Sequence, residues 1–272
     1  MIWRGFGTGL FLALIGVGGS VLALTVFPLI TLAVRDRKRR RDSIQYVLHH
    51  ALRLYCFGIH LFRVADVRLK DVERLRNLRG VLIIANHPSL LDVVMIMAAV
   101  PNVQCVVKGG LWRNPFFRFT VEGAGYLRND LPPDELMEAC VATLKAGDNL
   151  ILFPEGTRTV RGAPMRLHRG FANIALAAAA DLQMITMTCE PPMLHKGNPW
   201  WRAPVTRTTF MMEVGERLDI KRFLGYRYRS VSARKLVDFV ENYYSEKLVD
   251  EQSGRRTEAT DRFGIETGGL VA

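Results

Sequence analysis

Residues 81–92 read VLIIANHPSLLD and decide the fold, because an apolar run, a proline-containing turn and a second apolar stretch follow one another. A short apolar run that ends in a turn is typical of a strand buried on both faces, and the residues after it predict a helix. His87 comes directly after the expected strand, and Asp92 stands at the start of the expected helix. Such a turn is able to fold the carboxylate back onto the imidazole.

The same alternation continues toward the C-terminus, and it predicts an α/β architecture. We expect strands at residues 81–85, 103–107, 149–153, 183–189 and 210–214, and helices at residues 91–99, 133–145, 171–180 and 231–247. After residue 250 the chain is mostly polar and charged, which predicts a loosely ordered tail. The expected division is therefore N-terminal membrane-anchoring helices over residues 1–64, a catalytic domain over 65–249 and a polar tail over 250–272.

The N-terminal part has the composition of a membrane segment. Residues 10–34 contain no charged side chain, and a run of this length is sufficient to cross a bilayer as a helix. The basic run of residues 35–41 follows it, which predicts that its C-terminal side faces the cytoplasm. Glycines and a proline inside the run leave a re-entrant or interfacial element as the alternative. Residues 43–64 predict a second helix, either interfacial or packed on a protein core.

The formal net charge of +11 and the pI near 9.9 imply an anionic partner. The basic run lies beside the apolar segment, which favours anionic lipid over nucleic acid, and no nucleic-acid-binding motif is present. The four cysteines are scattered, without C-x-x-C or zinc-ligand spacing, so we expect neither a metal site nor structural disulfides. We also expect no bound cofactor.

His87 and Asp92 suggest general base catalysis. A carboxylate that accepts a hydrogen bond from one ring nitrogen leaves the other nitrogen free to take a proton from an attacking hydroxyl. The carboxylate also stabilises the imidazolium that results. The alternative from spacing alone is a capped turn without chemistry, in which Asp92 is only an N-terminal helix residue.

A second turn, in residues 149–158 (NLILFPEGTR), resembles a phosphate-binding element at the end of a strand. Arg158 supplies a bidentate donor fork, Thr157 supplies a hydroxyl, and Gly156 allows main-chain N–H groups to approach an anion. A carboxylate would repel phosphate, so Glu155 needs another role. We expect it either to bind a glycerol hydroxyl or to orient Arg158.

Together, the His87-x4-Asp92 pair and the Phe153-Pro154-Glu155-Gly156-Thr157-Arg158 turn resemble the glycerolipid acyltransferase family, particularly the lysophosphatidic acid acyltransferases. The resemblance covers roughly residues 80–215. It implies a mixed sheet flanked by helices, with an N-terminal membrane helix or two-helix membrane motif, and acyl transfer without a covalent enzyme intermediate.

The resemblance also implies further substrate-binding residues. Gly125-Tyr126-Leu127-Arg128 matches the family's intermediate motif, which makes Arg128 a second phosphate donor. Lys108 belongs to a stretch similar to the lysine-to-proline segment between the first two motifs. The family's fourth motif is matched in residues 185–192 by a strand and a proline, but the neighbouring residues differ.

The function expected from the resemblance is acyl transfer from an acyl thioester, acyl-CoA or acyl carrier protein as co-substrate, to the free hydroxyl of a lysophospholipid. The expected acceptor is 1-acyl-sn-glycerol-3-phosphate, which gives phosphatidic acid. The expected location is a bacterial-type inner membrane, with the active site on the cytoplasmic face. Membrane lipids, the lysophospholipid and the thioester carrier are the expected partners.

Two alternatives stay open. One is an acyltransferase with a different acceptor, such as an amino-lipid or a lipid of a polyene or specialised fatty-acid pathway. The residues of the fourth motif and the Lys196-Gly197 and Trp200-Trp201 pairs resemble acyltransferases of such bacterial pathways, which use a carrier-protein thioester. The other alternative is a catalytically silent membrane adaptor that keeps the fold to bind lipid.

Overall fold

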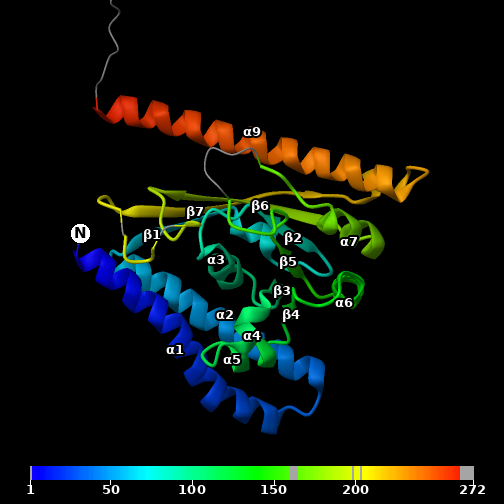
Figure 1. Cartoon of the computed structure of the whole chain (residues 1–272), viewed down its shortest axis with the longest axis horizontal. Helices are drawn as coiled ribbons and strands as arrows, with labels where there is room; N and C mark the ends of the chain where they lie inside the picture. The colour runs from blue at the N-terminus through cyan, green and yellow to red at the C-terminus, as the bar shows by residue number, and fades with distance from the viewer. Residues whose placement is uncertain (1, 160–164, 198, 203, 264–272) are drawn as a thin grey trace, which may run out of the picture.

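The computed structural model describes residues 2–159, 165–197, 199–202 and 204–263. Within these residues, seven strands form one sheet in the order β1-β7-β6-β2-β5-β3-β4 (Figure 1). The strands are β1 (Ala65–Lys70), β2 (Leu82–Ala85), β3 (Gln104–Val107), β4 (Leu127–Arg128), β5 (Leu150–Leu152), β6 (Leu182–Glu190) and β7 (Thr208–Leu218).

The strand directions bring the carboxyl ends of several strands to one edge of the sheet. Strands β6, β2, β5, β3 and β4 pair in parallel, whereas β7 runs antiparallel to β6, and β1 runs parallel to β7. The expected mixed sheet is therefore confirmed. The carboxyl ends of the five parallel strands meet at a single edge, which is where ligands bind in open α/β sheets.

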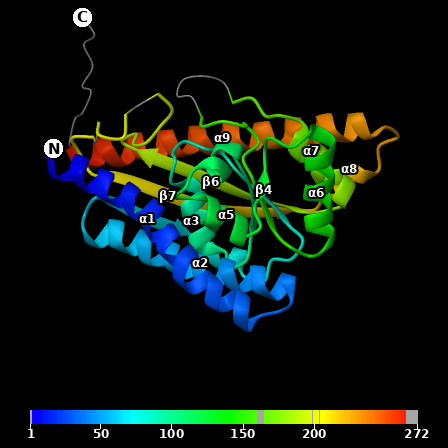
Figure 2. The ribbon, with the colours of Figure 1, turned by 60° about the horizontal axis from the view of Figure 1, so that its bottom comes forward.

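Helices cover both faces of the sheet (Figures 1 and 2). The helices on one face share a core with α3, and those on the other share a core with α7 and α9. They are α1 (Ile2–Ala33), α2 (Arg37–Leu61), α3 (Asp92–Ala99), α4 (Gly109–Arg113), α5 (Arg118–Gly123), α6 (Pro133–Lys145), α7 (Gly170–Ala178), α8 (Lys221–Leu224) and α9 (Arg229–Phe263), with a 3-10 helix, η1 (Val72–Leu75), after β1.

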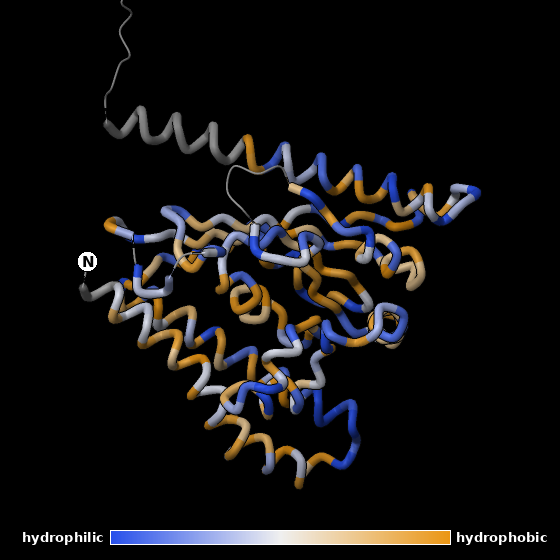
Figure 3. Tube along the Cα trace, in the orientation of Figure 1, coloured by the Kyte–Doolittle hydropathy of each residue, from blue (hydrophilic) through white to orange (hydrophobic). Residues whose placement is uncertain are grey.

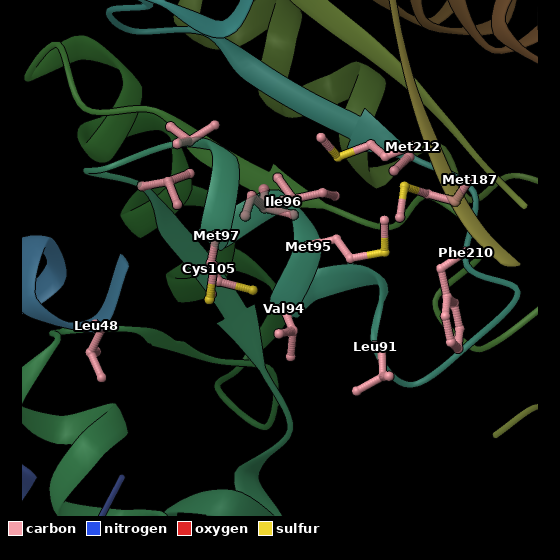
Figure 4. Close-up of a cluster of buried hydrophobic side chains, with 14 of the residues drawn as sticks. Leu48, Leu91, Val94, Met95, Ile96, Met97, Cys105, Met187, Phe210 and Met212 are labelled. Atoms are coloured by element: carbon pink, nitrogen blue, oxygen red, sulfur yellow. The ribbon is translucent and has the colours of Figure 1, made fainter. Parts of the chain in front are cut away.

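The core between α3 and the sheet contains several methionines (Figure 4). Met95 and Met97 of α3 lie in the same buried cluster as Met187 of β6 and Met212 of β7. The side chain of methionine is unbranched and flexible, so it fills irregular gaps between a helix and a twisted sheet. This packing fixes α3, which carries Asp92 at its first residue.

The expected elements agree with the structure to within a few residues at most boundaries, but the sequence did not predict β1 or β4. Strand β1 lies at the edge of the sheet and is largely exposed after its first residue, so it lacks the apolar run of a buried strand. Strand β4 has only two residues. Both lack the signal on which a strand prediction depends.

The prediction for the C-terminus was wrong in part. Helix α9 does not end near residue 247 but continues to Phe263, through much of the expected loose tail. Glu, Gln and Arg in that stretch are good helix formers, so a polar composition alone does not end a helix. The remaining residues, 264–272, lie outside the described part of the chain.

Helices α1 and α2 form an antiparallel hairpin against the α/β body (Figures 1 and 2). The buried face of α1, including Phe11 and Phe27, belongs to the same core as the sheet. The Ser20 hydroxyl donates to the carbonyl oxygen of Phe116 at 2.9 Å, before α5. In α2, Nδ1 of the buried His49 lies 2.9 Å from the carbonyl oxygen of Met97. The hairpin is therefore continuous with the domain core.

The other face of α1 is apolar and exposed (Figure 3). Among the described residues, one stretch, Gly5–Ala33, is long and apolar enough to cross a membrane by length and composition alone. Its exposed side chains recur every three to five residues and so form one continuous stripe. They are Phe6, Leu10, Leu14, Val17, Val21, Leu24, Leu29 and Leu32. We call this set the α1 stripe.

Candidate active site

The two sequence motifs meet because their strands are neighbours. His87 follows β2, and the Phe153–Arg158 turn follows β5, which pairs in parallel with β2. Both turns therefore leave the same edge of the sheet side by side. Strand β6 lies on the other side of β2, and the loop after it hydrogen-bonds both turns, through Met193 to Ser89 and through Leu194 to Arg158.

His87 and Asp92 form the expected pair. Nδ1 of His87 lies 2.8 Å from Oδ2 of Asp92, which also accepts the Ser89 N–H at 2.7 Å. The Asp92 side chain is fully buried, whereas the His87 side chain is 17% exposed. The pair is thus closed on the carboxylate side and open to solvent on the imidazole side. This is the arrangement that a general base requires.

The environment of Asp92 has two opposing effects on its pKa. Burial raises the pKa of the carboxyl group, and the hydrogen bonds from His87 and Ser89 lower it, with burial the stronger effect. The second carboxylate oxygen, Oδ1, is buried and makes no hydrogen bond within the described residues. An ionised Asp92 therefore depends strongly on His87 and Ser89 as partners.

The second turn holds the backbone and ring of His87. The His87 N–H donates to Oε1 of Glu155 at 3.0 Å and lies 3.1 Å from Oγ1 of Thr159. The Thr159 N–H donates to the His87 carbonyl at 2.7 Å, and its hydroxyl donates to Glu155 at 2.6 Å. Phe153 stacks on the imidazole with ring centroids 4.1 Å apart. The His87 ring therefore has little freedom to turn.

These contacts change the role expected for Glu155. Its carboxylate accepts hydrogen bonds from His87 and Thr159, whereas the Arg158 guanidinium donates to the Leu194 carbonyl oxygen at 2.7 Å. The expectation that Glu155 orients Arg158 is not supported by the described contacts. Glu155 instead acts as a brace between the two turns.

The rest of the turn faces outward. Gly156 has φ of +66°, and a Cβ there would lie 3.0 Å from the His168 ring, so only glycine fits without strain. Thr157 is exposed and Arg158 is half-buried. The turn thus presents a hydroxyl and a guanidinium beside His87.

Arg128 and Lys108 lie at the same edge but farther along it. Lys108 follows β3 and is exposed, while Arg128 stands in β4, three strands from β2, or about 14 Å at the usual strand spacing. The guanidinium of Arg128 makes two hydrogen bonds of 3.0 Å to Asp130 and lies over the ring of Trp112. Arg128 is thus held by Asp130 and Arg158 by Leu194, and the described contacts give the two guanidinium groups no shared partner.

Sequence reasoning missed several residues that support the site. The buried Asn86 side chain makes two hydrogen bonds to the backbone of Met187, which ties β2 to β6 just before His87. The Tyr244 hydroxyl from α9 lies 2.9 Å from the Ile84 carbonyl oxygen. Asn86 and Thr159 directly adjoin the two motifs, and this adjacency is the sequence signal that they offered. Tyr244 gave no sequence signal.

The described residues contain no group of three or more His, Cys, Asp or Glu side chains that could hold a metal ion. All four cysteines are free thiols. Burial raises the pKa of Cys189, the cysteine nearest the pair, to about 12. The side chains that the structure does place at this edge include the imidazole of His87, the carboxylates of Asp92 and Glu155, and the guanidinium of Arg158.

Fold and site together define the class of protein, an α/β protein with an imidazole-carboxylate pair at the carboxyl edge of its sheet. A solved structure, the 1-acyl-sn-glycerophosphate (LPA) acyltransferase from Thermotoga maritima, aligns with a TM-score of 0.68 over 90% of this chain and 95% of that chain. Its sequence identity is 20%, so this likeness concerns the fold alone.

A family model and several curated proteins match the sequence of this chain. Residues 66–190 match the family model described as Acyltransferase. The chain is similar to 1-acyl-sn-glycerol-3-phosphate acyltransferases of Cocos nucifera, at 31% identity over 39% of this chain, and of Helicobacter pylori strain J99, at 34% over 28%. The aligned segments span 36% and 35% of these two relatives. Residues 66–190 thus carry an Acyltransferase domain, and these relatives support the glycerolipid acyltransferase family.

Proposed function

We propose that the protein is an O-acyltransferase that moves an acyl chain from an acyl thioester to the free hydroxyl of a lysophospholipid. The proposed acceptor is 1-acyl-sn-glycerol-3-phosphate, which gives phosphatidic acid. The observation that carries the proposal is the 2.8 Å contact between His87 Nδ1 and the buried carboxylate of Asp92, one strand away from Arg158. The names of the similar proteins support the same activity.

The proposed reaction proceeds through a ternary complex. With the Nδ1 proton held by Asp92, Nε2 of His87 takes the proton of the acceptor hydroxyl as its oxygen attacks the thioester carbonyl. The new C–O bond forms, and the C–S bond then breaks. The leaving thiolate takes the proton from the imidazolium, which restores neutral His87. Alcohol and thioester thus become ester and thiol, without a covalent enzyme intermediate.

Binding of the acceptor phosphate is proposed for the turn that follows β5. A guanidinium fork matches the oxygens of a phosphate, and the exposed hydroxyl of Thr157 adds a donor nearby. Because Arg158 and His87 are held in fixed positions, binding of the phosphate at Arg158 would orient the acceptor hydroxyl toward His87. Arg128 and Lys108 extend the cationic edge, and we propose that they serve substrate phosphates farther from the reacting oxygen.

A direct test uses purified protein in detergent or vesicles, with a panel of acyl-CoA and acyl carrier protein thioesters against several lysolipids. We expect thiol release that depends on lysophosphatidate and product that comigrates with phosphatidic acid. Thiol release only with an amino-lipid or a specialised-pathway lipid would support the alternative acceptor. Binding of lipid with no thiol release from any donor would identify a silent adaptor and contradict the proposal.

Replacing Arg158 should affect phosphorylated acceptors selectively. We expect Arg158→Gln to raise the KM for lysophosphatidate by about tenfold or more, since a charge-assisted bond to phosphate is lost. The KM for a monoacylglycerol, which has no phosphate, should change little. Arg217→Gln is the matched control, because Arg217 pairs with Asp181 at the opposite edge of the sheet. Equal losses with both acceptors would contradict the phosphate role.

We propose that the hairpin of α1 and α2 holds the enzyme at the cytoplasmic face of a bacterial-type inner membrane. Helix α1 packs on the domain along one side, which supports embedding rather than crossing. The basic run beside the hairpin turn supports contact with anionic lipid. In this arrangement the carboxyl edge of the sheet meets lipid acceptors at the surface.

A charge on the α1 stripe should release the protein from vesicles. Leu24 is 67% exposed, and we expect Leu24→Asp to lower the vesicle partition coefficient by about tenfold or more. Leu224→Asp is the control, since Leu224 is an exposed leucine of α8, away from the hairpin. Cosedimentation with phosphatidylglycerol-containing vesicles measures both. Equal loss in the two variants would argue against membrane contact through the stripe.

A further inference from the structure

The loop between β6 and β7 contains a residue with an unusual backbone. Leu194 has φ of +56°, in the left-handed region that residues other than glycine, asparagine and aspartate rarely adopt. Its side chain is only 6% exposed and belongs to the core that includes Leu91 and Phe210. Burial of this side chain holds the backbone in a conformation that it would otherwise leave. Strained residues of this kind cluster at functional sites.

The carbonyl of Leu194 connects the two motif turns. Its oxygen accepts a hydrogen bond from Nη1 of Arg158 at 2.7 Å and from the N–H of Leu90 at 3.3 Å. Leu90 lies in the turn between His87 and Asp92, and Arg158 lies in the turn after β5. One carbonyl oxygen therefore contacts both the catalytic turn and the guanidinium proposed to bind phosphate.

The neighbouring residue, Met193, also connects this loop to the turn between His87 and Asp92. The Met193 carbonyl oxygen accepts the Ser89 hydroxyl at 3.0 Å, and the Met193 N–H donates to Sγ of Cys189 at 3.3 Å. Ser89 is fully buried, and its N–H binds Asp92. The loop is thus fixed to β6 on one side and to the catalytic turn on the other. Leu194 is the point at which this fixed segment reaches Arg158.

The direction of a carbonyl depends on the dihedral angles beside it. If Leu194 relaxed to negative φ, its carbonyl would turn away from Arg158, and the guanidinium would lose its fixed partner. A guanidinium carries five N–H donors, and the bond to Leu194 uses one of them. We infer that Leu194 is a positioning residue, whose left-handed backbone aims Arg158 at the acceptor phosphate and sets its distance from His87. This inference rests on the proposed function.

The test separates backbone direction from side-chain burial. Leu194→Ile keeps the apolar volume, but its branched Cβ strongly disfavours positive φ, whereas Leu194→Met keeps an unbranched Cβ. We expect Leu194→Ile to raise the KM for lysophosphatidate about five- to tenfold above that of Leu194→Met. The KM for the acyl thioester should differ by less than about twofold between them.

Ala179→Val is the control for strain without positioning. Ala179 has φ of +49° after α7, is exposed, and precedes the amino end of β6, far from the carboxyl edge. We expect this variant to lower Tm and to leave the lysophosphatidate KM unchanged. Equal lysophosphatidate KM values for Leu194→Ile and Leu194→Met would overturn the inference, and so would an equal rise for both substrates in Leu194→Ile.

Leu194→Gly keeps the test decisive if Leu194→Ile fails to fold. Glycine adopts positive φ freely, so the variant should lose Tm but raise the lysophosphatidate KM less than Arg158→Gln does. A rise as large as that of Arg158→Gln would show that burial, not backbone direction, matters, and would overturn the inference. If Arg158→Gln itself leaves this KM unchanged, the phosphate role in the proposed function fails. If Arg158→Gln raises it and Leu194→Ile does not, only the positioning role fails.

Discussion

Replacing His87 by alanine is expected to lower turnover by about 10³-fold or more, while the protein still folds and still partitions to vesicles. The expected loss is large because the proposed mechanism has no other group that can take the hydroxyl proton. The fold should survive, since the backbone of residue 87 remains bound by Glu155 and Thr159. Thiol release from the thioester donor, with circular dichroism and vesicle cosedimentation in parallel, measures these effects.

His50→Ala is a suitable control for this variant. His50 is an exposed histidine of α2 whose Nδ1 lies 3.0 Å from the backbone carbonyl of Tyr46. It should retain turnover, since its ring makes no contact with the His87 and Asp92 pair within the described residues. Wild-type turnover in His87→Ala would end the catalytic assignment and leave the adaptor alternative.

Asp92→Asn should separate catalysis from stability. An amide still fills the site, but it carries no charge to stabilise the imidazolium and can present the wrong tautomer of His87. The same replacement in a Ser-His-Asp triad lowers kcat by about 10⁴-fold, and we expect a loss of about 10²- to 10⁴-fold here. The rate of thiol release at saturating substrates gives kcat directly.

The pH dependence of stability has a definite sign for Asp92. Burial raises its pKa in the folded state, so the folded protein binds this proton more tightly than the unfolded chain. The resulting stability is fully present below the unfolded pKa and is lost as pH rises through the folded pKa. At pH values above the folded pKa the ionised carboxylate therefore costs stability. Asp92→Asn should be at least as stable as the wild type there, with any advantage shrinking as pH falls.

Glu213→Gln should change the pH dependence of stability in the opposite direction. Burial alone would raise the pKa of Glu213, but hydrogen bonds from Lys247 and Lys70 outweigh it, and the net pKa is lowered. This carboxylate contributes stability above its unfolded pKa, which is lost as pH falls through the folded pKa. Denaturant unfolding at several pH values compares both variants with the wild type. The same pH trend in both would contradict the reasoning for Asp92.

The sequence alone predicted the features that depend on local pattern. The apolar run before His87 predicted a buried strand, and the apolar run after Asp92 predicted a helix, because these two elements bury such runs of side chains. The five-residue separation allowed the carboxylate to return to the imidazole, which the 2.8 Å contact confirms as geometry. The uncharged run of residues 10–34 and the basic run after it likewise predicted an N-terminal membrane helix, and Gly5–Ala33 is long and apolar enough to be one.

Only the tertiary structure decided how these parts meet. His87 and Glu155 are 68 positions apart, and they touch because β2 and β5 are neighbours in an order that the chain does not follow. The same order separates Arg128 from Arg158 and leaves Arg128 with Asp130. Leu194 and Tyr244 act through one carbonyl and one hydroxyl, whose partners are set by packing across the sheet. Local propensity determines which elements form, whereas long-range burial and hydrogen bonding determine which side chains become neighbours.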